Sequence, residues 1–272
     1  MAFRLIVVFS VLIGALASAQ SPPNSYLGFD RNDYPGDQNL PDLRQTFSFA
    51  GYWLNNPPGE TSNNWAGKRS TIESAGFGFL VLFNGRLDAE LKSVAKARSL
   101  GTTDARAGAA AARREGFAAC SIIFLDQEDG GRMLPEQKAY IYAWVDGVNA
   151  SGFHAGVYCS GIAAKDDQNI VTADDIGHHA GRRSIVYFVA NDQCPPSPGC
   201  AFPNDSLSPA SSGTRFADIW QFAQSPKRMD FAVGCPANYA ADGKCYAPGI
   251  TNKIYIDVDT ATSADPSNTR SR

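Results

Sequence analysis

Residues 121–131 read SIIFLDQEDGG, a short apolar run that ends in three acids and two glycines. The run is too short for a core helix and is bounded by turn residues, so it predicts a buried strand. Because side chains alternate along a strand, Asp126 and Glu128 point to the same side, with Cα atoms roughly 6.5–7 Å apart. Two carboxylates at the mouth of a buried strand are costly to desolvate, and glycosidic bond cleavage requires such a pair.

Similar strand-like runs, rich in Val, Ile, Phe and Tyr, recur along the chain, and several are apolar throughout, as strands buried on both faces are. Helical patterns fill several of the gaps between these runs. Eight strands with intervening helices predict an α/β fold, a (β/α)8 TIM-type barrel. The expected strands are residues 26–30, 47–54, 77–83, 121–128, 155–160, 185–191, 218–223 and 254–259; the expected helices are 64–75, 87–100, 103–115, 135–150 and 172–180.

The last part of the barrel departs from this ideal. Residues 193–215 and 225–253 have weak helical signal and many Pro, Gly and Ser, so we expect long loops in place of the last helices. Two cysteine pairs bracket short stretches of these loops, and local disulfides there are the favoured pairing, although sequence alone does not fix connectivity. The pairs are Cys194/Cys200 and Cys235/Cys245.

The other two cysteines, Cys120 and Cys159, belong to consecutive strands. One begins its strand and the other ends the next, so parallel strands would hold them too far apart for a bridge. We expect both to be buried free thiols. No cysteine or histidine spacing suggests zinc.

The first nineteen residues resemble a secretory signal, with Arg4, an apolar run over residues 5–16 and a small-residue cleavage site at 17–19. The run is shorter than the roughly 20 residues of a membrane span. We therefore expect secretion to the periplasm or the outside of the cell, a single domain over residues 20–262 and a flexible tail over 263–272. A formal charge of −3 with scattered basic residues shows no footprint for nucleic acid. We expect a monomer without cofactor.

Acids gather where the expected strands end. Asp30 ends the first strand, Asp126 and Glu128 end the fourth, and Asp257 with Asp259 ends the eighth. The carboxyl ends of barrel strands meet at one face, where active sites lie, so these three groups would meet there. Oxygens of Asp126, Glu128, Asp129 and Asp257 could hold Ca²⁺, but nothing resembles a calcium loop, so we expect no metal site.

Aromatic and amide side chains lie near the same rim, and flat rings stack on sugar faces. Phe83 and Tyr187 are more readily explained as core residues. Polar residues follow the two tryptophans, which makes these the better candidates. The expected substrate-binding residues are Tyr34, Trp53, Tyr158, Asn191, Trp220 and Gln221.

Several motifs occur in an order that resembles a known family. They are Leu27-Gly-Phe-Asp30, Phe124-Leu-Asp-Gln-Glu128, His154-Ala-Gly-Val-Tyr-Cys159, Ile219-Trp-Gln221 and Ile256-Asp-Val258. The set resembles family 25 glycoside hydrolases, the secreted lysozyme-like muramidases. The longer run to Arg132 and the segment Gly85-Arg86-Leu87-Asp88 are more similar to the bacterial glycoside-hydrolase-like domains first catalogued as domain-of-unknown-function family 1906.

This resemblance implies a barrel related to the muramidases and assigns roles by position. Glu128 matches the general acid/base, Asp126 matches the second carboxylate, and Asp30 and Asp257 match the acids that complete the pocket. The cysteine-bracketed loops and the helical segment at 87–100 are not typical of muramidases. For the closer group, the resemblance implies a sugar-cleaving architecture and not an established reaction.

The leading hypothesis is a secreted glycosidase acting on cell-wall or related polysaccharide, including peptidoglycan. Glu128 would protonate the leaving oxygen, with its pKa raised by the charge of Asp126 and by partial desolvation. Asp126 would stabilise the developing positive sugar or hold an N-acetyl group. The alternatives are a non-catalytic glycan-binding module of the cell envelope, and a structural envelope protein whose acids form a hydrogen-bonded lattice.

Overall fold

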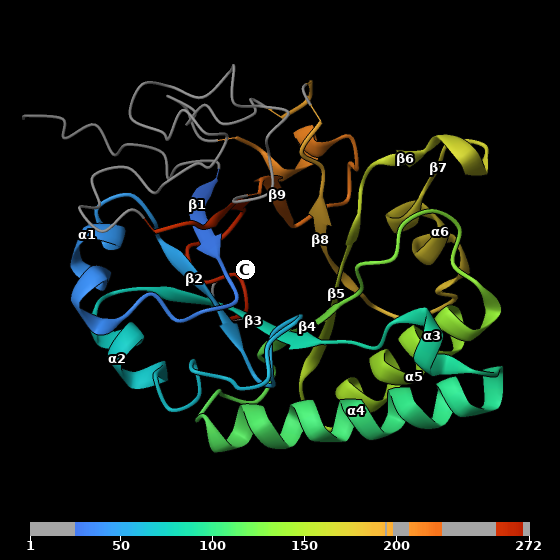
Figure 1. Ribbon diagram of the computed structural model, residues 1–272, viewed down its shortest axis with the longest axis horizontal. Helices are drawn as coiled ribbons and strands as arrows, with labels where there is room; N and C mark the ends of the chain where they lie inside the picture. Colours follow the sequence, from blue (N-terminus) through green and yellow to red (C-terminus); the bar gives the residue numbers. More distant parts are fainter. Residues whose placement is uncertain (1–24, 194, 198–206, 225–253, 269–272) are drawn as a thin grey trace, which may run out of the picture.

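A closed barrel is the centre of the structure, a computed structural model that describes residues 25–193, 195–197, 207–224 and 254–268. Eight strands close in the order β1-β10-β9-β8-β5-β4-β3-β2 (Figure 1). The expected α/β barrel is therefore confirmed, and each expected strand overlaps an observed one. The barrel strands are β1 (Tyr26–Asp30), β2 (Phe49–Trp53), β3 (Gly78–Asn84), β4 (Ile122–Asp126), β5 (His154–Ser160), β8 (Val186–Ala190), β9 (Ile219–Ala223) and β10 (Asp257–Ala261).

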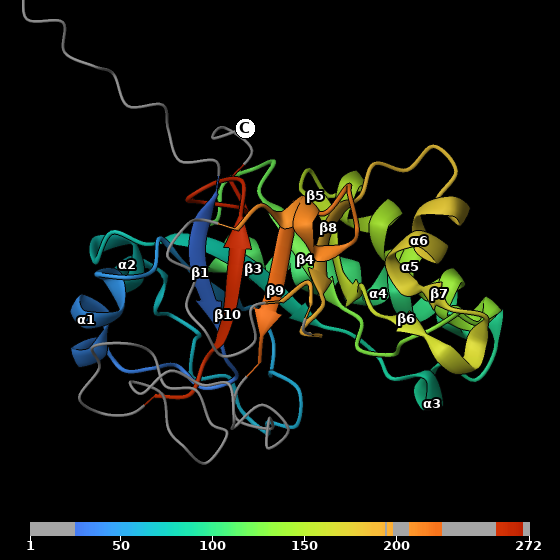
Figure 2. The ribbon, with the colours of Figure 1, turned by 90° about the horizontal axis from the view of Figure 1, so that it is seen from above.

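One strand runs against the others. β10 is antiparallel to both of its neighbours, β1 and β9, whereas the other neighbouring pairs in the barrel are parallel (Figure 2). The expectation of a regular (β/α)8 barrel is therefore wrong at this strand. Apolar patterning marks a strand but not its direction, so the reversal left no signal in the sequence. β10 also begins at Asp257, three residues later than expected.

Helices cover the outside of the barrel beside the earlier strands (Figure 1). From β8 onward, the described residues contain one 3₁₀ helix and no α-helix. No helix in the described part of the chain is long and apolar enough to cross a bilayer. The helices are α1 (Leu40–Arg44), α2 (Arg69–Ser74), α3 (Asp88–Leu91), α4 (Val94–Arg114), α5 (Pro135–Ala150) and α6 (Thr172–His179), with 3₁₀ helices η1 (Asp37–Asn39), η2 (Lys165–Asp167) and η3 (Pro209–Ser212); β6 (Ala163–Ala164) and β7 (Ile170–Val171) form a small antiparallel sheet.

The α4 helix is continuous where the sequence predicted two helices, and it packs along α5 (Figure 1). Gly101 lies inside it, and a Cβ at this position would lie 2.3 Å from the backbone oxygen of Tyr140 in α5. Gly108 faces the ring of Trp144 in the same way. A glycine inside a helix costs roughly 1 kcal/mol, and the close approach of α5 offsets this cost.

The two cysteines inside the described residues differ in environment. Cys159 is a buried free thiol, as expected, and burial raises its pKa to about 12. Cys120 is also free but exposed, so the expectation of burial is wrong for it. It lies in the turn before β4 with a φ of 66°, rather than in the strand. Cys194, Cys200, Cys235 and Cys245, with the two expected disulfides, lie outside the described residues.

Residues 263–268, which we expected in a flexible tail, pack between β3 and β4. Asp265 Oδ1 and Ser267 Oγ accept hydrogen bonds from the backbone N–H groups of Phe79 and Val81, both at 2.8 Å. The backbone of Ser267 bonds to β3 on one side and to Ile122 of β4 on the other. The segment therefore fills the gap where β3 and β4 pair only over their last three residues.

Candidate active site

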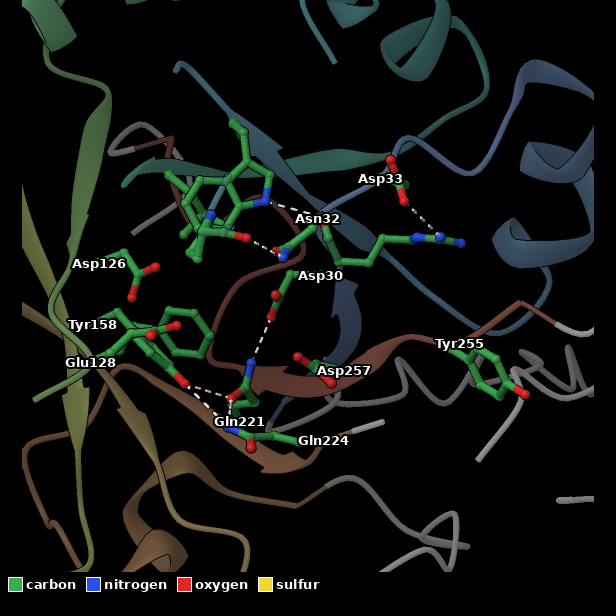
Figure 3. A pocket seen from close by; sticks show the side chains of 15 residues that line it. Asp30, Asn32, Asp33, Asp126, Glu128, Tyr158, Gln221, Gln224, Tyr255 and Asp257 are labelled. Carbon is green, nitrogen blue, oxygen red and sulfur yellow. Dashed lines mark hydrogen bonds and ion pairs between the residues drawn. The ribbon is translucent and has the colours of Figure 1, made fainter. Parts of the chain in front are cut away.

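A pocket of about 410 Å³ lies at the end of the barrel where β1, β4 and β9 terminate. Figure 3 shows the side chains that line it. The four acids expected to carry catalysis all line this one pocket: Asp30, Asp126, Glu128 and Asp257. The structure thus brings together residues that lie more than 200 positions apart in the sequence.

Strand direction explains how Asp257 reaches the pocket. Asp30 is the last residue of β1 and is paired directly with Asp257, the first residue of β10. The sequence argument placed Asp257 at the carboxyl end of a parallel strand. Asp257 does lie at this face, but for a different reason: β10 is antiparallel, so it is its amino end that reaches the pocket.

Asp126 and Glu128 have different environments. Asp126 is 6% exposed, and its Oδ1 atom has no hydrogen-bond partner among the described residues. Burial, followed by the charges of Glu128 and Asp30, raises the pKa of Asp126 well above its usual range. Glu128 lies beyond the end of β4 and is exposed. The desolvation that we expected at Glu128 therefore falls on Asp126.

Asp30 is held from two directions. Its Oδ2 atom accepts a hydrogen bond from Gln221 Nε2 at 2.8 Å (Figure 3), and its carboxyl is also bonded to that of Asp259. Burial raises the pKa of Asp30 to about 6, and these two hydrogen bonds oppose the rise. Asp259 is fully buried, and burial with the charges of Asp30 and Asp257 raises its pKa well above the usual range.

Three uncharged groups continue the network from Asp30. Gln221 Oε1 accepts hydrogen bonds from Tyr158 Oη and from Gln224 Nε2, each at 2.7 Å. With its oxygen occupied in this way, Gln221 turns its amide nitrogen toward Asp30. Burial, and then the charges of the acids led by Asp126, raises the pKa of Tyr158 well above its usual value, so its hydroxyl stays protonated.

The expected substrate-binding residues divide into two groups. Trp53, Tyr158 and Gln221 line the pocket. Tyr34, Asn191 and Trp220 do not line it, and each is engaged elsewhere. Tyr34 Oη donates a hydrogen bond to Asp37, and its ring packs edge-on against Trp65. Trp220 Nε1 donates to the backbone oxygen of Asn191. The side-chain amide of Asn191 donates to the backbone oxygen of Ser212.

Pattern reasoning placed Trp220 in the pocket because polar Gln221 follows it. Side chains alternate across a strand, so the residue next to a pocket-facing glutamine must point away from the barrel interior. Trp220 is accordingly fully buried and packs against Phe222.

Several pocket residues were missed by the sequence analysis. Arg31, Asn32 and Asp33 follow Asp30 directly, so the end of β1 could have identified them. Gln224 follows the end of β9 in the same way. The interior faces of two strands supply Leu82 and Phe188, which carry no polar signal. Pro58 and Tyr255 complete the lining.

Asp259 was also missed as part of the site, although the sequence analysis noted its place beside Asp257. Within the described residues, no group of three or more His, Cys, Asp or Glu side chains is arranged to hold a metal ion. The described lining consists of carboxyl groups, amides, two phenols and apolar or aromatic side chains, with Arg31 as its cationic residue.

Comparison with known proteins gives the family. Residues 46–179 match the family described as "Rv2525c-like, glycoside hydrolase-like domain". Over these residues the chain resembles an Rv2525c-like domain. The resemblance inferred from the ordered motifs is thereby confirmed. The matched residues include β4 with Asp126 and Glu128, whereas β1, β9 and β10 lie outside them. No curated protein matches the chain.

Solved structures share the fold of this Rv2525c-like chain at low sequence identity. An uncharacterized B. stearothermophilus protein is 18% identical with a TM-score of 0.54, covering 87% of this chain and 95% of that one. GHIP, a glycosyl hydrolase 25 of Streptococcus pneumoniae, is 14% identical with a TM-score of 0.50, covering 86% of each chain. The autolysin LytC of Streptococcus pneumoniae is 13% identical with a TM-score of 0.50, covering 87% of this chain and 46% of that one.

Proposed function

We propose that the protein is a glycoside hydrolase that acts on cell-wall or related polysaccharide. One observation carries the proposal: Asp126 and Glu128, two residues apart, line a single pocket that Asp30 and Asp257 enter from β1 and β10. Glycosidases use a pair of carboxyl groups flanking the scissile bond. A pocket of about 410 Å³ is large enough for a sugar unit.

The environments of the two carboxyl groups suggest how the work is divided. Glu128 is at the open mouth, where the oxygen between two sugar units can reach it, and we assign it the protonation of that oxygen. Asp126 lies beneath, buried and with an unoccupied oxygen, so it can bond to the bound sugar, including an N-acetyl group. The rings of Trp53 and Tyr158 provide apolar surface for the sugar faces.

Cell-wall polysaccharide is the favoured substrate class because of the relatives. GHIP is described as a glycosyl hydrolase 25 and LytC as an autolysin, and both share this barrel. The signal-like residues 1–19 lie outside the described part of the chain, and we infer from their sequence that the protein works outside the cytoplasm. We expect the monomer to be the working form.

The direct test is turnover of purified peptidoglycan and of chitin oligosaccharides by the mature protein. Release of reducing ends by the wild type, and its loss in Glu128→Gln, would support hydrolysis. Glu73→Gln is the matched control, because Glu73 lies in α2 and forms only an exposed ion pair with Arg69. Equal, negligible release by the wild type and by Glu128→Gln on every substrate would refute the proposal.

A non-catalytic glycan-binding module is the second candidate, and one observation favours it. Burial and the neighbouring charges raise the pKa of Asp126 well above its usual range and so favour its neutral form, which stabilises a positively charged sugar less than an anion does. This alternative predicts saturable binding of cell-wall fragments without product. Tyr255→Ala, in the pocket lining, should weaken that binding, whereas Phe216→Ala, an exposed ring packed on Tyr187, should not.

A further inference from the structure

Asp259 lies one layer deeper in the barrel than the pocket acids. In the pairing of β10 with β1, Asp257 is opposite Asp30 and Asp259 is opposite Gly28. Side chains alternate along a strand, so Asp257 and Asp259 point to the same side, the barrel interior. On its other edge, Asp259 pairs with Gln221 of β9. Asp259 is therefore placed one layer beneath Asp30 and beside Gln221, the glutamine that bonds to Asp30.

Among the described residues, no basic group neutralises this buried carboxyl. Asp259 is 0% exposed, and within the described chain neither of its oxygens accepts a hydrogen bond from an amide, a hydroxyl or a cationic group. The polar group in contact with it is the Asp30 carboxyl. Two carboxyl groups in contact in a buried site cannot both ionise without a large cost, so such a pair keeps one proton.

We propose that Asp259 retains this proton at neutral pH and donates it in a hydrogen bond to Asp30, which makes Asp259 a positioning residue that holds Asp30 as a single anion facing the pocket. Its importance for catalysis rests on the proposed glycosidase function. The protonation itself does not, because it follows from burial and contact.

The neighbours of the pair decide which member keeps the proton. Asp30 receives a hydrogen bond from Gln221 Nε2, which favours its anion, whereas Asp259 has no such donor. The pKa directions are consistent with this order. The pKa of Asp30 is raised to about 6 against the opposing effect of the Gln221 hydrogen bond, and the pKa of Asp259 is raised well above its usual range.

The other groups that face the pair from neighbouring strands do not reverse this order. The charge of Asp257 opposes ionisation of Asp259, the charge of Asp30 opposes ionisation of Asp126, and Tyr158 is uncharged. Arg31, next to Asp30, is drawn instead toward Asp33 and Asp257.

The arrangement fixes the geometry of Asp30. Gln221 donates to Oδ2, with its own oxygen occupied by Tyr158 and Gln224, and Asp259 donates from the layer below. A carboxylate with two donors on opposite sides has little freedom to rotate. Replacing Asp259 by an amide keeps a donor of similar shape, whereas replacing it by leucine removes the donor.

Carboxyl ¹³C NMR of aspartate-labelled protein at about pH 7 tests the protonation. The wild type should show protonated aspartate resonances, one of which is missing in Asp259→Asn and present in Asp88→Asn, a control at the exposed start of α3. A wild type in which every aspartate is ionised at this pH would overturn the inference. That result needs no variant, so it remains decisive even if a variant fails to fold, and persistence of every protonated resonance in a folded Asp259→Asn would overturn the assignment to Asp259.

The positioning role is tested by measuring kcat and KM on a polysaccharide that the wild type cleaves. Misplacing a catalytic group costs on the order of 10- to 100-fold in rate. Asp259→Leu should lower kcat by about this factor with little change in KM, and Asp259→Asn should restore most of it. Equal kcat and equal pH profiles in all three proteins would overturn the positioning role. If the wild type cleaves nothing but its protonated resonance depends on Asp259, the proposed function fails and the proton assignment stands.

Discussion

The raised pKa of Asp30 predicts a measurable loss of stability as the pH rises. An acid whose pKa is higher in the folded state binds its proton more tightly there. Its contribution to stability is therefore fully present below the unfolded pKa and is lost as the pH rises through the folded pKa. For Asp30 these values are 3.8 and about 6. At about 1.4 kcal/mol for each pH unit, the interval amounts to about 3 kcal/mol, lost between about pH 4 and pH 7.

Urea unfolding of the wild type and of Asp30→Asn at a series of pH values measures this contribution. The asparagine cannot ionise but can still accept the hydrogen bond from Gln221. The fall in unfolding free energy from about pH 4 to pH 8 should be smaller in Asp30→Asn by about 3 kcal/mol. The Asp30 charge also raises the pKa values of Asp126 and Asp259, so its removal weakens their pH dependence as well, and the difference between the two proteins should be of this size or larger. Parallel stability curves for the two proteins would refute the assignment.

Three further predictions concern the rest of the fold. Asp104→Ala should lower the free energy of unfolding, measured in urea, by about 2–4 kcal/mol, because buried Asp104 binds both Arg86 and Tyr140. Asp146→Ala is the control: it breaks an equally bidentate but exposed pair with Arg183 and should lower the same free energy by less than about 1 kcal/mol. Gly101→Ala should lower the free energy of unfolding by about 1–3 kcal/mol, because the new Cβ would lie 2.3 Å from the backbone oxygen of Tyr140 in α5. Gly177→Ala should raise it by about 0.5–1 kcal/mol, because its Cβ would meet its nearest atom at 3.5 Å. Equal effects of the two substitutions would contradict the packing argument. Peptide mapping after brief thiol labelling should find Cys120 modified and Cys159 protected until the protein unfolds; early labelling of Cys159 would contradict its burial.

The sequence predicted the barrel well because its strands are buried on both faces. Runs such as the one ending at Asp126 stay apolar until the pocket begins, so both the strand and its functional end are visible in one pattern. The α5 helix was also predicted with correct bounds, since a proline opens it and a glycine follows its end. Local sequence was sufficient to predict an element when the residues at its own ends determined where it begins and stops.

The errors arise where a distant part of the chain decides the outcome. Gly101 looked like a break between two helices, but α5 packs on this position and makes it part of one helix. Ser267 looked like part of a polar tail, but β3 and β4 leave backbone groups that only this segment satisfies. Tyr34 and Trp220 looked like sugar-binding rings, but their partners lie outside the pocket. None of these partners is visible in the local sequence.

The direction of β10 decides which aspartate meets a ligand. Asp257 and Asp259 point to the same side whichever way the strand runs, so one of them must lie at the pocket and the other one layer below. In a parallel strand, Asp259 would lie at the mouth and Asp257 beneath it. The observed reversal places Asp257 beside Asp30 in the pocket and leaves Asp259 fully buried beneath them. The direction of one strand thus decides which of the two aspartates faces the pocket, and exchanging Asp257 and Asp259 for asparagine one at a time should affect the site in different ways.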